Sequence, residues 1–351
     1  MLQVAIIGAS GYSGEELVRL ILRHPRVRLT CITSRQNAGK RLADVFPQFA
    51  KNPTAQQLKF IEPEVGRLLK HLGRHSQSSI VFLAMPHGVA MEWVVPLEKH
   101  GLSLIDLSAD FRLKEAVVYR QYYGRTHPAP ALLKRAVYGL TEIHRPAIRK
   151  ARLIACPGCY PTSILLPLIP LLRAGLIQSD GIIADSLSGV SGSGRKVEDA
   201  FLFCECNESA RPYGVANHRH LPEIEQELSL AARKRVAIQF TPHLIPMNRG
   251  ILTTLYARPA KKCADIAATV SRCYQKVYGK EPFIRLLSQP FLPDTKNIAG
   301  SNMVEMAHCF DSRTGRLILF SALDNLTKGA AGQAVQNMNI LFGFPETEGL
   351  F

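Results

Sequence analysis

The sequence predicts an α/β protein, in which a Rossmann-type doubly wound parallel sheet precedes a second, α+β domain. Three observations support this prediction. Short apolar runs alternate with helical patterns over the first 155 residues, a glycine-rich turn follows the first run, and strands become more frequent beyond about residue 158. A chain of 351 residues is also long enough for two domains.

The first apolar run, residues 2–7, ends at Gly8 and has the composition of a buried parallel strand. Residues 14–24 follow with leucine and isoleucine at helical spacing, and residues 28–34 form a second strand. This order of strand, turn, helix and strand opens a doubly wound sheet. The alternation continues with strands at 79–84, 102–107 and 152–155 and a helix at 93–100.

The second half of the chain begins with a strongly apolar helix at residues 161–174, which is predicted despite its prolines. Further strands are predicted at 181–188, 237–244, 250–257 and 317–322, and a final helix at 328–342. We therefore divide the chain into a Rossmann domain at 1–155, an α+β domain at 156–322 and a C-terminal segment at 323–351.

Composition excludes several classes of protein. The chain is 46% hydrophobic and 20% charged, which is typical of a globular protein, and no apolar stretch is long enough to span a membrane. The N-terminus lacks the basic region of a signal peptide, and the eight cysteines suggest no disulfide framework. We therefore expect a cytoplasmic protein.

The net charge of +15 is concentrated in the first 150 residues, which contribute +11 of it. Such an excess can indicate nucleic acid, an acidic protein or anionic small molecules as partners, or only a basic solvated surface. The basic residues are scattered and no aromatic residues are interleaved with them. This pattern argues against a nucleic-acid-binding module.

The turn after the first strand has the spacing Gly-x-x-Gly-x-x-Gly. Glycines allow a positive φ and close approach of the backbone to a pyrophosphate, and the following helix N-terminus supplies free N–H groups. The turn could be a tight connection without a ligand, but its position between strand and helix favours a dinucleotide. The expected cofactor-binding residues here are Gly8, Ser10, Gly11, Tyr12, Ser13 and Gly14.

The end of the second strand indicates which dinucleotide binds. NAD sites place an acidic residue about 20 residues beyond the glycines, whereas this chain has Ser34 and Arg35. A hydroxyl and a guanidinium suit the 2′-phosphate of NADP(H). We therefore predict NADP(H) as the cofactor.

Cys159 is the candidate nucleophile. It directly precedes the apolar helix, and a helix N-terminus stabilises a thiolate. Cys156 and Cys159 could instead form a redox dithiol or ligate zinc, or Cys159 could fill the core. Zinc needs two further ligands, for which Cys204 and Cys206 are a poor pair, so no metal site is predicted.

A nucleophilic thiol needs a base. The densest group of histidines contains His218 and His220, with Glu223 close enough in sequence to orient an imidazole. The sequence does not separate the roles of the two histidines. His243 and His308 lie on predicted strands and are more simply structural.

Three other segments supply candidate contacts. Residues 188–195 are rich in glycine and follow a strand, so they could close over the nicotinamide, cradle a phosphate or form a surface loop. Arg112 is a candidate anion contact or a surface arginine, and Pro86 follows a strand that would line the cofactor cleft. We assign Pro86, Ser188, Gly189 and Gly192 to the cofactor and Arg112 and Ser191 to the substrate.

Together these segments resemble the N-acetyl-γ-glutamyl-phosphate reductase family, which shares its architecture with aspartate-semialdehyde dehydrogenase. The resemblance covers essentially the whole chain. It rests on GASGYSGEEL, TSR, MPHG, DLSADFRL, YGLTE, PGCYPT, SGVSGSGR, HRHLPEIEQEL, PHLIPMNRGILTT and DNLTKGAAGQAVQNMN.

The resemblance implies the third step of arginine biosynthesis. The Cys159 thiolate would attack N-acetylglutamyl 5-phosphate, phosphate would leave, NADPH would reduce the thioester, and the hemithioacetal would collapse to the semialdehyde. The resemblance also implies that the second domain is catalytic and dimerising and that the chain forms a homo-oligomer. It further implies that the C-terminal helix returns to the Rossmann domain, with Asn325 facing the dinucleotide.

Two positions depart from the related patterns. Cys156 stands where Asn is common before the Pro-Gly-Cys motif, and Ile251 stands where aspartate-semialdehyde dehydrogenases carry histidine, so the acid/base should be His218 or His220. Three alternatives stay open. They are a lysine-biosynthesis counterpart that acts on aminoadipyl phosphate bound to an acidic carrier protein, aspartate-semialdehyde dehydrogenase itself, and a non-catalytic NADP-binding sensor or nucleic-acid-binding protein.

Overall fold

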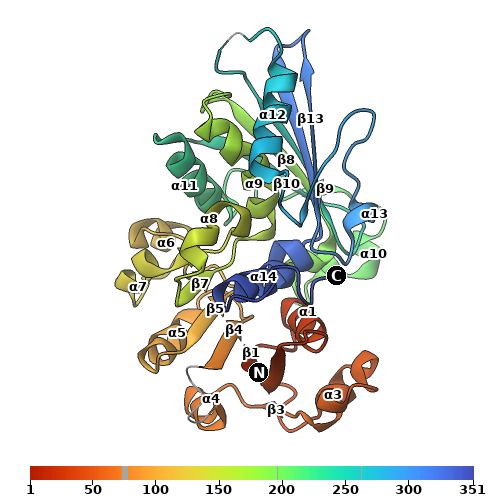
Figure 1. Ribbon diagram of the computed structural model, residues 1–351. Helices are drawn as coiled ribbons and strands as arrows, with labels where there is room; N and C mark the ends of the chain where they lie inside the picture. The colour runs from red at the N-terminus through yellow and green to blue at the C-terminus, as the bar shows by residue number, and fades with distance from the viewer. Residues whose placement is uncertain (73–77, 196, 262) are drawn as a thin grey trace. The chain divides into compact units, whose positions relative to one another are not determined.

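The computed structural model describes residues 1–72, 78–195, 197–261 and 263–351 and contains two compact units (Figure 1). Unit 1 comprises Met1–Pro157 and Ala330–Phe351, and unit 2 comprises Gly158–Gly329. Both junctions lie a few residues beyond the boundaries drawn from the sequence. The second junction is later because the side chains of Asp324 and Asn325 accept hydrogen bonds from backbone N–H groups of unit 2.

Unit 1 contains a parallel sheet with the strand order β3-β2-β1-β4-β5-β7-β6. Strands β1 and β4 are almost wholly buried, as expected for a sheet with helices on both faces. The predicted doubly wound sheet is confirmed. Its strands are β1 (Leu2–Ile7), β2 (Val27–Thr33), β3 (Phe60–Ile61), β4 (Ser79–Leu83), β5 (Ser103–Asp106), β6 (Val137–Tyr138) and β7 (Leu153–Ala155).

The helices of unit 1 are α1 (Tyr12–Ile21), α2 (Leu42–Val45), α3 (Pro53–Gln57), α4 (Val65–Leu72), α5 (Ala90–Lys99), α6 (Ala116–Tyr123), α7 (Pro130–Arg135), α8 (Thr141–Ile148) and α14 (Gly332–Leu341). Helix α14 packs against α1 and α8 and is buried although it carries several amide side chains. These amides have partners within unit 1: Asn337 donates to the Gly139 carbonyl, and Asn339 bonds to His24. The sequence predicted one helix from residue 328, but a π-helical turn at Thr327–Ala331 precedes α14.

Unit 2 contains a mixed sheet with the strand order β12-β13-β14-β11-β8-β10-β9. Strand β8 is parallel to β10 and antiparallel to β11, and β14 is antiparallel to β11 and β13. The predicted α+β character is confirmed. The strands are β8 (Ile182–Ser188), β9 (Arg211–Pro212), β10 (Ile238–Leu244), β11 (Ile251–Ala257), β12 (Ile284–Leu286), β13 (Val304–Asp311) and β14 (Arg316–Leu323).

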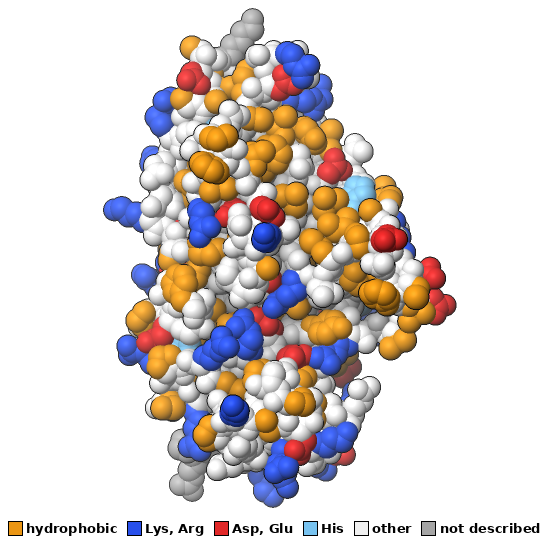
Figure 2. Space-filling model, turned by 90° about the vertical axis from the view of Figure 1, so that its right-hand side faces the viewer, with side chains coloured by type: hydrophobic (Ala, Val, Ile, Leu, Met, Phe, Trp, Pro, Cys, Tyr) orange, Lys and Arg blue, Asp and Glu red, His pale blue; other side chains and the backbone are white. Residues whose placement is uncertain are grey.

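The two faces of this second sheet differ in exposure. Along β8 and β11, every second residue is buried and the residues between them are partly exposed. Ile183, Tyr256 and Ile318 are direct neighbours on the partly exposed face. Figure 2 shows hydrophobic side chains gathered over unit 2, in the upper part of the view. This face therefore carries more apolar surface than a fully solvated sheet face usually does.

The helices of unit 2 are α9 (Cys159–Arg173), α10 (Phe203–Cys206), α11 (Leu221–Ala232), α12 (Ile266–Tyr278) and α13 (Thr295–Ile298). Helix α9 is buried along most of its length and packs against α11, β11 and β14. Pro167 has no N–H for the carbonyl of Ser163, four residues earlier, and the Ser321 hydroxyl donates to that carbonyl at 2.6 Å. Tyr278 does the same for the carbonyl freed by Pro170. The interior prolines therefore leave neither carbonyl unsatisfied.

Candidate active site

The glycine-rich turn of unit 1 depends on its glycines at two positions. Gly8 has φ +81°, and a Cβ atom there would come within 2.5 Å of the Ala84 carbonyl oxygen. A Cβ atom at Gly14 would come within 2.3 Å of the Gly8 carbonyl oxygen. Gly11 differs, because its Cβ would meet only the Gly8 oxygen, at 3.7 Å. Gly8 and Gly14 thus serve the packing of the turn, while Gly11 leaves room above it.

This turn has the features that a dinucleotide pyrophosphate needs. Helix α1 begins at Tyr12, directly before Ser13, and its N-cap Gly11 provides no side-chain cap for the first N–H groups. The Ser10 hydroxyl lies 2.9 Å from that of buried Ser34, which ties the turn to the end of β2. Arg35 is exposed beside this pair. The donors and the open space at Gly11 therefore fit a phosphorylated dinucleotide.

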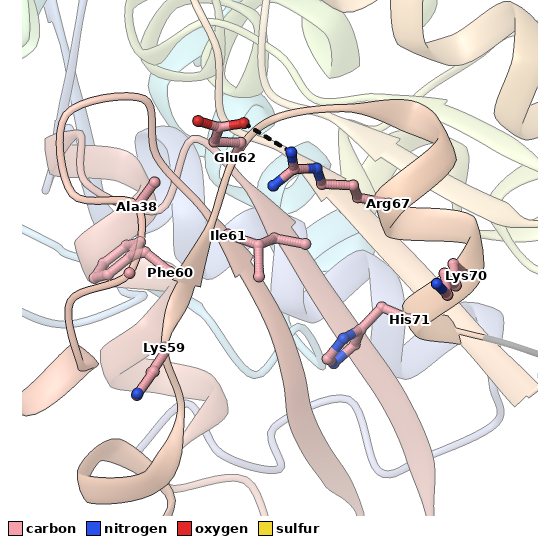
Figure 3. Close-up of a pocket in the computed structure, with 9 residues that line it drawn as sticks. Ala38, Lys59, Phe60, Ile61, Glu62, Arg67, Lys70 and His71 are labelled. Atoms are coloured by element: carbon pink, nitrogen blue, oxygen red, sulfur yellow. Dashed lines mark ion pairs between the residues drawn. The ribbon is translucent and has the colours of Figure 1, made fainter.

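A separate cavity of about 850 Å³ lies beside β3 in unit 1 (Figure 3). Lys59 and Lys70 stand on its wall, and Arg67 is paired with Glu62 at 3.2 Å. The remaining lining residues are Ala38, Gly39, Phe60, Ile61 and His71. None of the residues that the sequence assigned to cofactor or catalysis lines this cavity, so it does not enter the candidate site.

Arg112 is buried in unit 1 and serves the backbone. Its Nε donates to the Cys156 carbonyl at 2.7 Å, and its Nη2 donates to the Leu107 carbonyl at 2.9 Å. These bonds join the chain segments that follow β5 and β7. Pro86 lies in the loop after β4. The first residue of this loop, Ala84, is close to Gly8 of the glycine-rich turn.

The end of β5 carries an unusual carboxyl group. Asp106 is fully buried, and burial raises its pKa to about 7, with the nearby charge of Asp110 as the second cause. Both carboxylate oxygens accept hydrogen bonds from Ser108, from its N–H and from its hydroxyl, each at 2.9 Å. Asp110 is also fully buried and accepts from the Gly88 N–H and from the Tyr119 hydroxyl.

In unit 2, Cys159 is the first residue of α9 and is partly exposed. The helix therefore begins two residues before the predicted start, which puts the thiol on the N-terminal turn. Its N-cap is Gly158, whose N–H donates to the buried Glu223 carboxylate at 2.9 Å. A Cβ atom at Gly329 would lie 2.7 Å from Cys159 Cβ, so the turn before α14 closely backs the thiol residue.

The aromatic ring of Tyr160, directly after Cys159, brings the two histidines together. The His218 ring lies 5.5 Å from it and the His220 ring 6.0 Å, and the two imidazoles are 4.9 Å apart. The Tyr213 hydroxyl donates to that of Tyr160 at 2.8 Å. The structure thus collects His218 and His220 around the first turn of α9, the turn that carries Cys159.

His218 and His220 are not equivalent. The His218 Nδ1 accepts the backbone N–H of His220 at 3.1 Å, which places the proton of a neutral His218 ring on Nε2. Burial lowers the pKa of His218 to about 4, and Arg219 adds to the effect. His218 is therefore a neutral imidazole at physiological pH that presents an N–H donor.

The second glycine-rich segment is held within unit 2 by Asn325. The Asn325 Oδ1 accepts the Gly250 N–H at 2.7 Å, and its Nδ2 donates to the Ser191 hydroxyl at 2.9 Å. The backbone N–H of Gly189 donates to the Gly250 carbonyl. A Cβ atom at Gly189 would come within 2.7 Å of the Asn248 oxygen, whereas Gly192 has only ordinary contacts. Ser188 is buried at the end of β8.

Sequence reasoning missed Tyr160, Tyr213 and Asp324. Asp324 is fully buried, accepts the Gly300 N–H at 2.7 Å and pairs with Arg249 at 3.2 Å. The position of Tyr160 next to Cys159 was a usable signal, but nothing in the sequence marked Tyr213.

Over the part of the chain that the structure describes, no group of three or more His, Cys, Asp or Glu residues could hold a metal ion. Among the described helices, none combines the length and the hydrophobicity needed to cross a membrane.

Two family models match the chain, one for each unit. The semialdehyde dehydrogenase NAD binding domain matches residues 3–151, and the semialdehyde dehydrogenase dimerisation domain matches residues 159–325. An aspartate-semialdehyde dehydrogenase II from Vibrio cholerae has the same fold, with a TM-score of 0.72 at 19% identity over 98% of this chain and 99% of that one. An aspartate-semialdehyde dehydrogenase with NADP from Candida albicans has a TM-score of 0.68 at 17% identity over 97% and 99%. Fold and site thus define a semialdehyde dehydrogenase-type enzyme.

Relatives that match the chain over its full length show which family of this enzyme class it belongs to. An N-acetyl-gamma-glutamyl-phosphate reductase from Akkermansia muciniphila is 52% identical over 99% of this chain and 98% of its own length. Proteins of the same name from Geobacter sulfurreducens and Moorella thermoacetica are 50% and 48% identical over 100% of this chain and 98% of theirs. The chain belongs to the N-acetyl-γ-glutamyl-phosphate reductase family. The family resemblance predicted from the sequence is confirmed.

Proposed function

We propose that this chain reduces N-acetyl-L-glutamyl 5-phosphate to N-acetyl-L-glutamate 5-semialdehyde and phosphate, with NADPH as the hydride donor. This is the third step of arginine biosynthesis. One observation carries the proposal: Cys159 begins the buried helix α9, and Tyr160 gathers His218 and His220 around the same helical turn. The names of the full-length relatives supply the substrate.

Unit 1 is our candidate for the dinucleotide. The pyrophosphate would rest on the backbone N–H groups of the turn from Gly8 to Gly14, and Ser34 and Arg35 would hold the 2′-phosphate. We keep Pro86 and the segment with Ser188, Gly189 and Gly192 as further candidates. When bound, NADPH supplies the hydride; all the other chemistry below belongs to the chain.

The first step forms a thioester. Cys159 Sγ bonds to the acyl carbon, and the bond from that carbon to the phosphate oxygen breaks. The N-terminal dipole of α9 favours the thiolate, and backbone N–H groups at the same helix end can stabilise the oxyanion of the tetrahedral intermediate. Glu223 fixes the Gly158 N–H and so sets the entry into α9.

We assign His220 as the base that removes the proton of the Cys159 thiol. We assign His218 as the hydrogen-bond donor that stabilises the oxyanion. A base must offer a lone pair, but His218 Nδ1 already accepts a backbone N–H and its pKa is lowered to about 4. His218 can instead donate a hydrogen bond from its Nε2–H to the oxygen of the thioester as that oxygen gains charge, while keeping the proton. The hemithioacetal oxyanion then collapses: its carbon–oxygen double bond forms and the carbon–sulfur bond breaks, which regenerates the Cys159 thiolate and leaves the aldehyde.

Arg112 and Ser191 stay our candidates for the substrate. Ser191 is anchored on both sides, since its hydroxyl also donates to the Asn248 carbonyl at 2.5 Å, and Asn325 positions it. The Arg112 guanidinium donates two hydrogen bonds to backbone carbonyls, so it is rigidly held. A preorganised cation of this kind suits an anionic acyl phosphate.

We further propose that the chain assembles into a homo-oligomer in the cytosol. Ten of the thirteen large hydrophobic side chains exposed in the described residues belong to unit 2, which matches the dimerisation domain. Apolar surface of this extent favours association with a second copy. All eight cysteines are free, which suits a reducing compartment. Light scattering after size-exclusion chromatography should give at least twice the chain mass of 38.8 kDa, and a monomer would contradict the proposal.

The reverse reaction tests the catalytic proposal with stable reagents. The purified protein should reduce NADP⁺ in the presence of N-acetylglutamate 5-semialdehyde and inorganic phosphate, and only when both are present. Cys159→Ser should abolish this turnover while NADPH still binds, and Cys204→Ser, which changes an exposed cysteine, is the matched control. Normal turnover by Cys159→Ser would falsify the assignment of the nucleophile.

A further inference from the structure

A chain of buried hydroxyl groups runs from the sheet of unit 2 to the first turn of α9. It contains Ser186 on β8, Thr253 on β11 and Ser163 on α9, and all three side chains are fully buried. The Thr253 Oγ1 lies 2.7 Å from Ser163 Oγ and 2.8 Å from Ser186 Oγ. The catalytic proposal uses none of these residues.

Because each hydroxyl has one hydrogen to donate, the donor and the acceptor of every bond in this row of hydroxyl groups can be assigned. The Ser163 hydroxyl donates to the Tyr160 carbonyl at 2.9 Å, so its single hydrogen is used there and it must accept from Thr253. Thr253 in turn has used its hydrogen and must accept from Ser186. The sequence of donors is therefore Ser186, Thr253, Ser163 and finally the backbone of Tyr160.

A third strand reaches the same turn of α9. The Ser321 hydroxyl of β14 donates to the Ser163 carbonyl, which is free because Pro167 has no N–H. Three neighbouring strands, β8, β11 and β14, thus reach one turn of α9 through buried hydrogen bonds. Hydrogen bonds inside a protein core are directional and costly to break, so they fix position more tightly than apolar contacts do.

We infer that Thr253 is a positioning residue that sets where the first turn of α9 holds the reactive thiol and its histidines. It acts through Ser163 on the Tyr160 carbonyl, and Tyr160 is bonded to Cys159 on one side and packs against both imidazoles with its ring. A shift of this turn would move the thiol relative to the helix dipole and to the histidines together. The inference rests on the proposed function of Cys159 as the nucleophile.

Thr253→Val tests the inference, because valine keeps the shape and removes the hydroxyl. We expect kcat to fall about 10- to 100-fold with KM changed less than about twofold, since misplacement of a reacting group costs rate more than binding. The pH profile of Cys159 alkylation by iodoacetamide, followed by peptide mass spectrometry, should shift by about half a pH unit or more. Thr253→Ser should restore both. Thr254→Val, at the next position on the opposite face of β11, is the matched control.

A purely structural role predicts a different result. Thr253→Val would then lower the melting temperature but keep the wild-type kcat and alkylation profile, and that outcome would overturn the inference. If Thr253→Val does not fold, Ser163→Ala replaces it as the test variant. This substitution removes the hydroxyl that donates to the Tyr160 carbonyl, and its kcat and Cys159 alkylation profile are measured in the same way. The alkylation profile needs no substrate. It therefore still decides the inference if the wild-type protein fails to turn over the acyl phosphate, a failure that would count against the proposed function alone.

Discussion

Gly329 lies so close to Cys159 that a methyl group on Gly329 would come within 2.7 Å of Cys159 Cβ and 3.2 Å of its Cα. Real Cβ atoms do not approach this closely, so one of the two backbones must move if Gly329 gains a side chain. The close packing against Cys159 thus leaves no room for a side chain at Gly329, the last residue of unit 2.

Gly329→Ala should therefore lower kcat by about 100-fold, because a displacement near 1 Å at a reacting group has an effect of that order. NADPH binding should be unchanged. Gly66→Ala is the control, since Gly66 sits in α4 and a Cβ there would meet nothing within 4 Å. Steady-state kinetics of the two variants check the prediction, and equal kcat values would count against close packing at Cys159.

The two histidines should separate in their pH dependence. Because the pKa of His218 is lowered to about 4, His218 stays neutral above that pH and its protonation does not limit activity between pH 5 and 9. His218→Asn should reduce kcat roughly 10-fold or more through loss of an oxyanion donor but keep the acidic limb of the kcat/KM profile. His220→Asn should remove that limb. The opposite pattern would reverse the two roles.

The glycines of the glycine-rich turn in unit 1 should fall into two groups. Gly11→Ala should weaken NADPH binding about 10-fold or more, equal to about 1.4 kcal/mol, without changing the melting temperature, because the methyl group meets only the Gly8 oxygen, at an ordinary contact distance of 3.7 Å. Gly14→Ala should instead destabilise the fold, since its methyl group would come within 2.3 Å of the Gly8 oxygen. Fluorescence titration with NADPH and thermal melts distinguish the two effects.

Arg35 should carry the preference for NADPH over NADH. Arg35→Ala should reduce that preference about 10- to 100-fold by weakening NADPH binding alone, because a charged hydrogen bond to phosphate contributes about 1.5–3 kcal/mol. Arg28→Ala, an exposed arginine near the opposite end of β2, is the control. Titrations with both dinucleotides test this, and unchanged discrimination in Arg35→Ala would refute it.

Asp106 should make unit 1 less stable as the pH rises from about 4 to about 7. Its pKa is about 7 in the folded chain and near 3.8 when unfolded, so between these values the folded chain holds a proton that the unfolded chain releases. The loss is up to about 4 kcal/mol over this window. Denaturation by urea at several pH values should show a smaller loss for Asp106→Asn than for the wild type. The exposed carboxylate variant Asp44→Asn should behave like the wild type.

Much of the fold was predictable because local patterns coincide with the tertiary result. The continuous apolar runs of β1 and β4 predict buried parallel strands, and they are buried. The sequence pattern predicts one continuous helix at 328–342, but a π-helical turn at Thr327–Ala331 precedes α14, because a sequence pattern does not show that the backbone near Gly329 must adapt to Cys159. The positions of two candidate site residues were also predictable, since Cys159 is placed by its helix and Ser34 by its strand.

By itself, the sequence determined the doubly wound sheet, the glycine-rich turn and the cysteine at the start of a helix. These features depend on residues that are close in the chain. Only the tertiary structure decided which histidine can accept a proton, since that depends on the hydrogen bond to His218 Nδ1 and on burial. It also decided that Thr253, Ser186 and Ser321 meet on one turn of α9. Hydrogen bonds between distant residues, and the burial of a side chain such as His218, depend on distances in the folded chain. These distances cannot be derived from the order of residues alone.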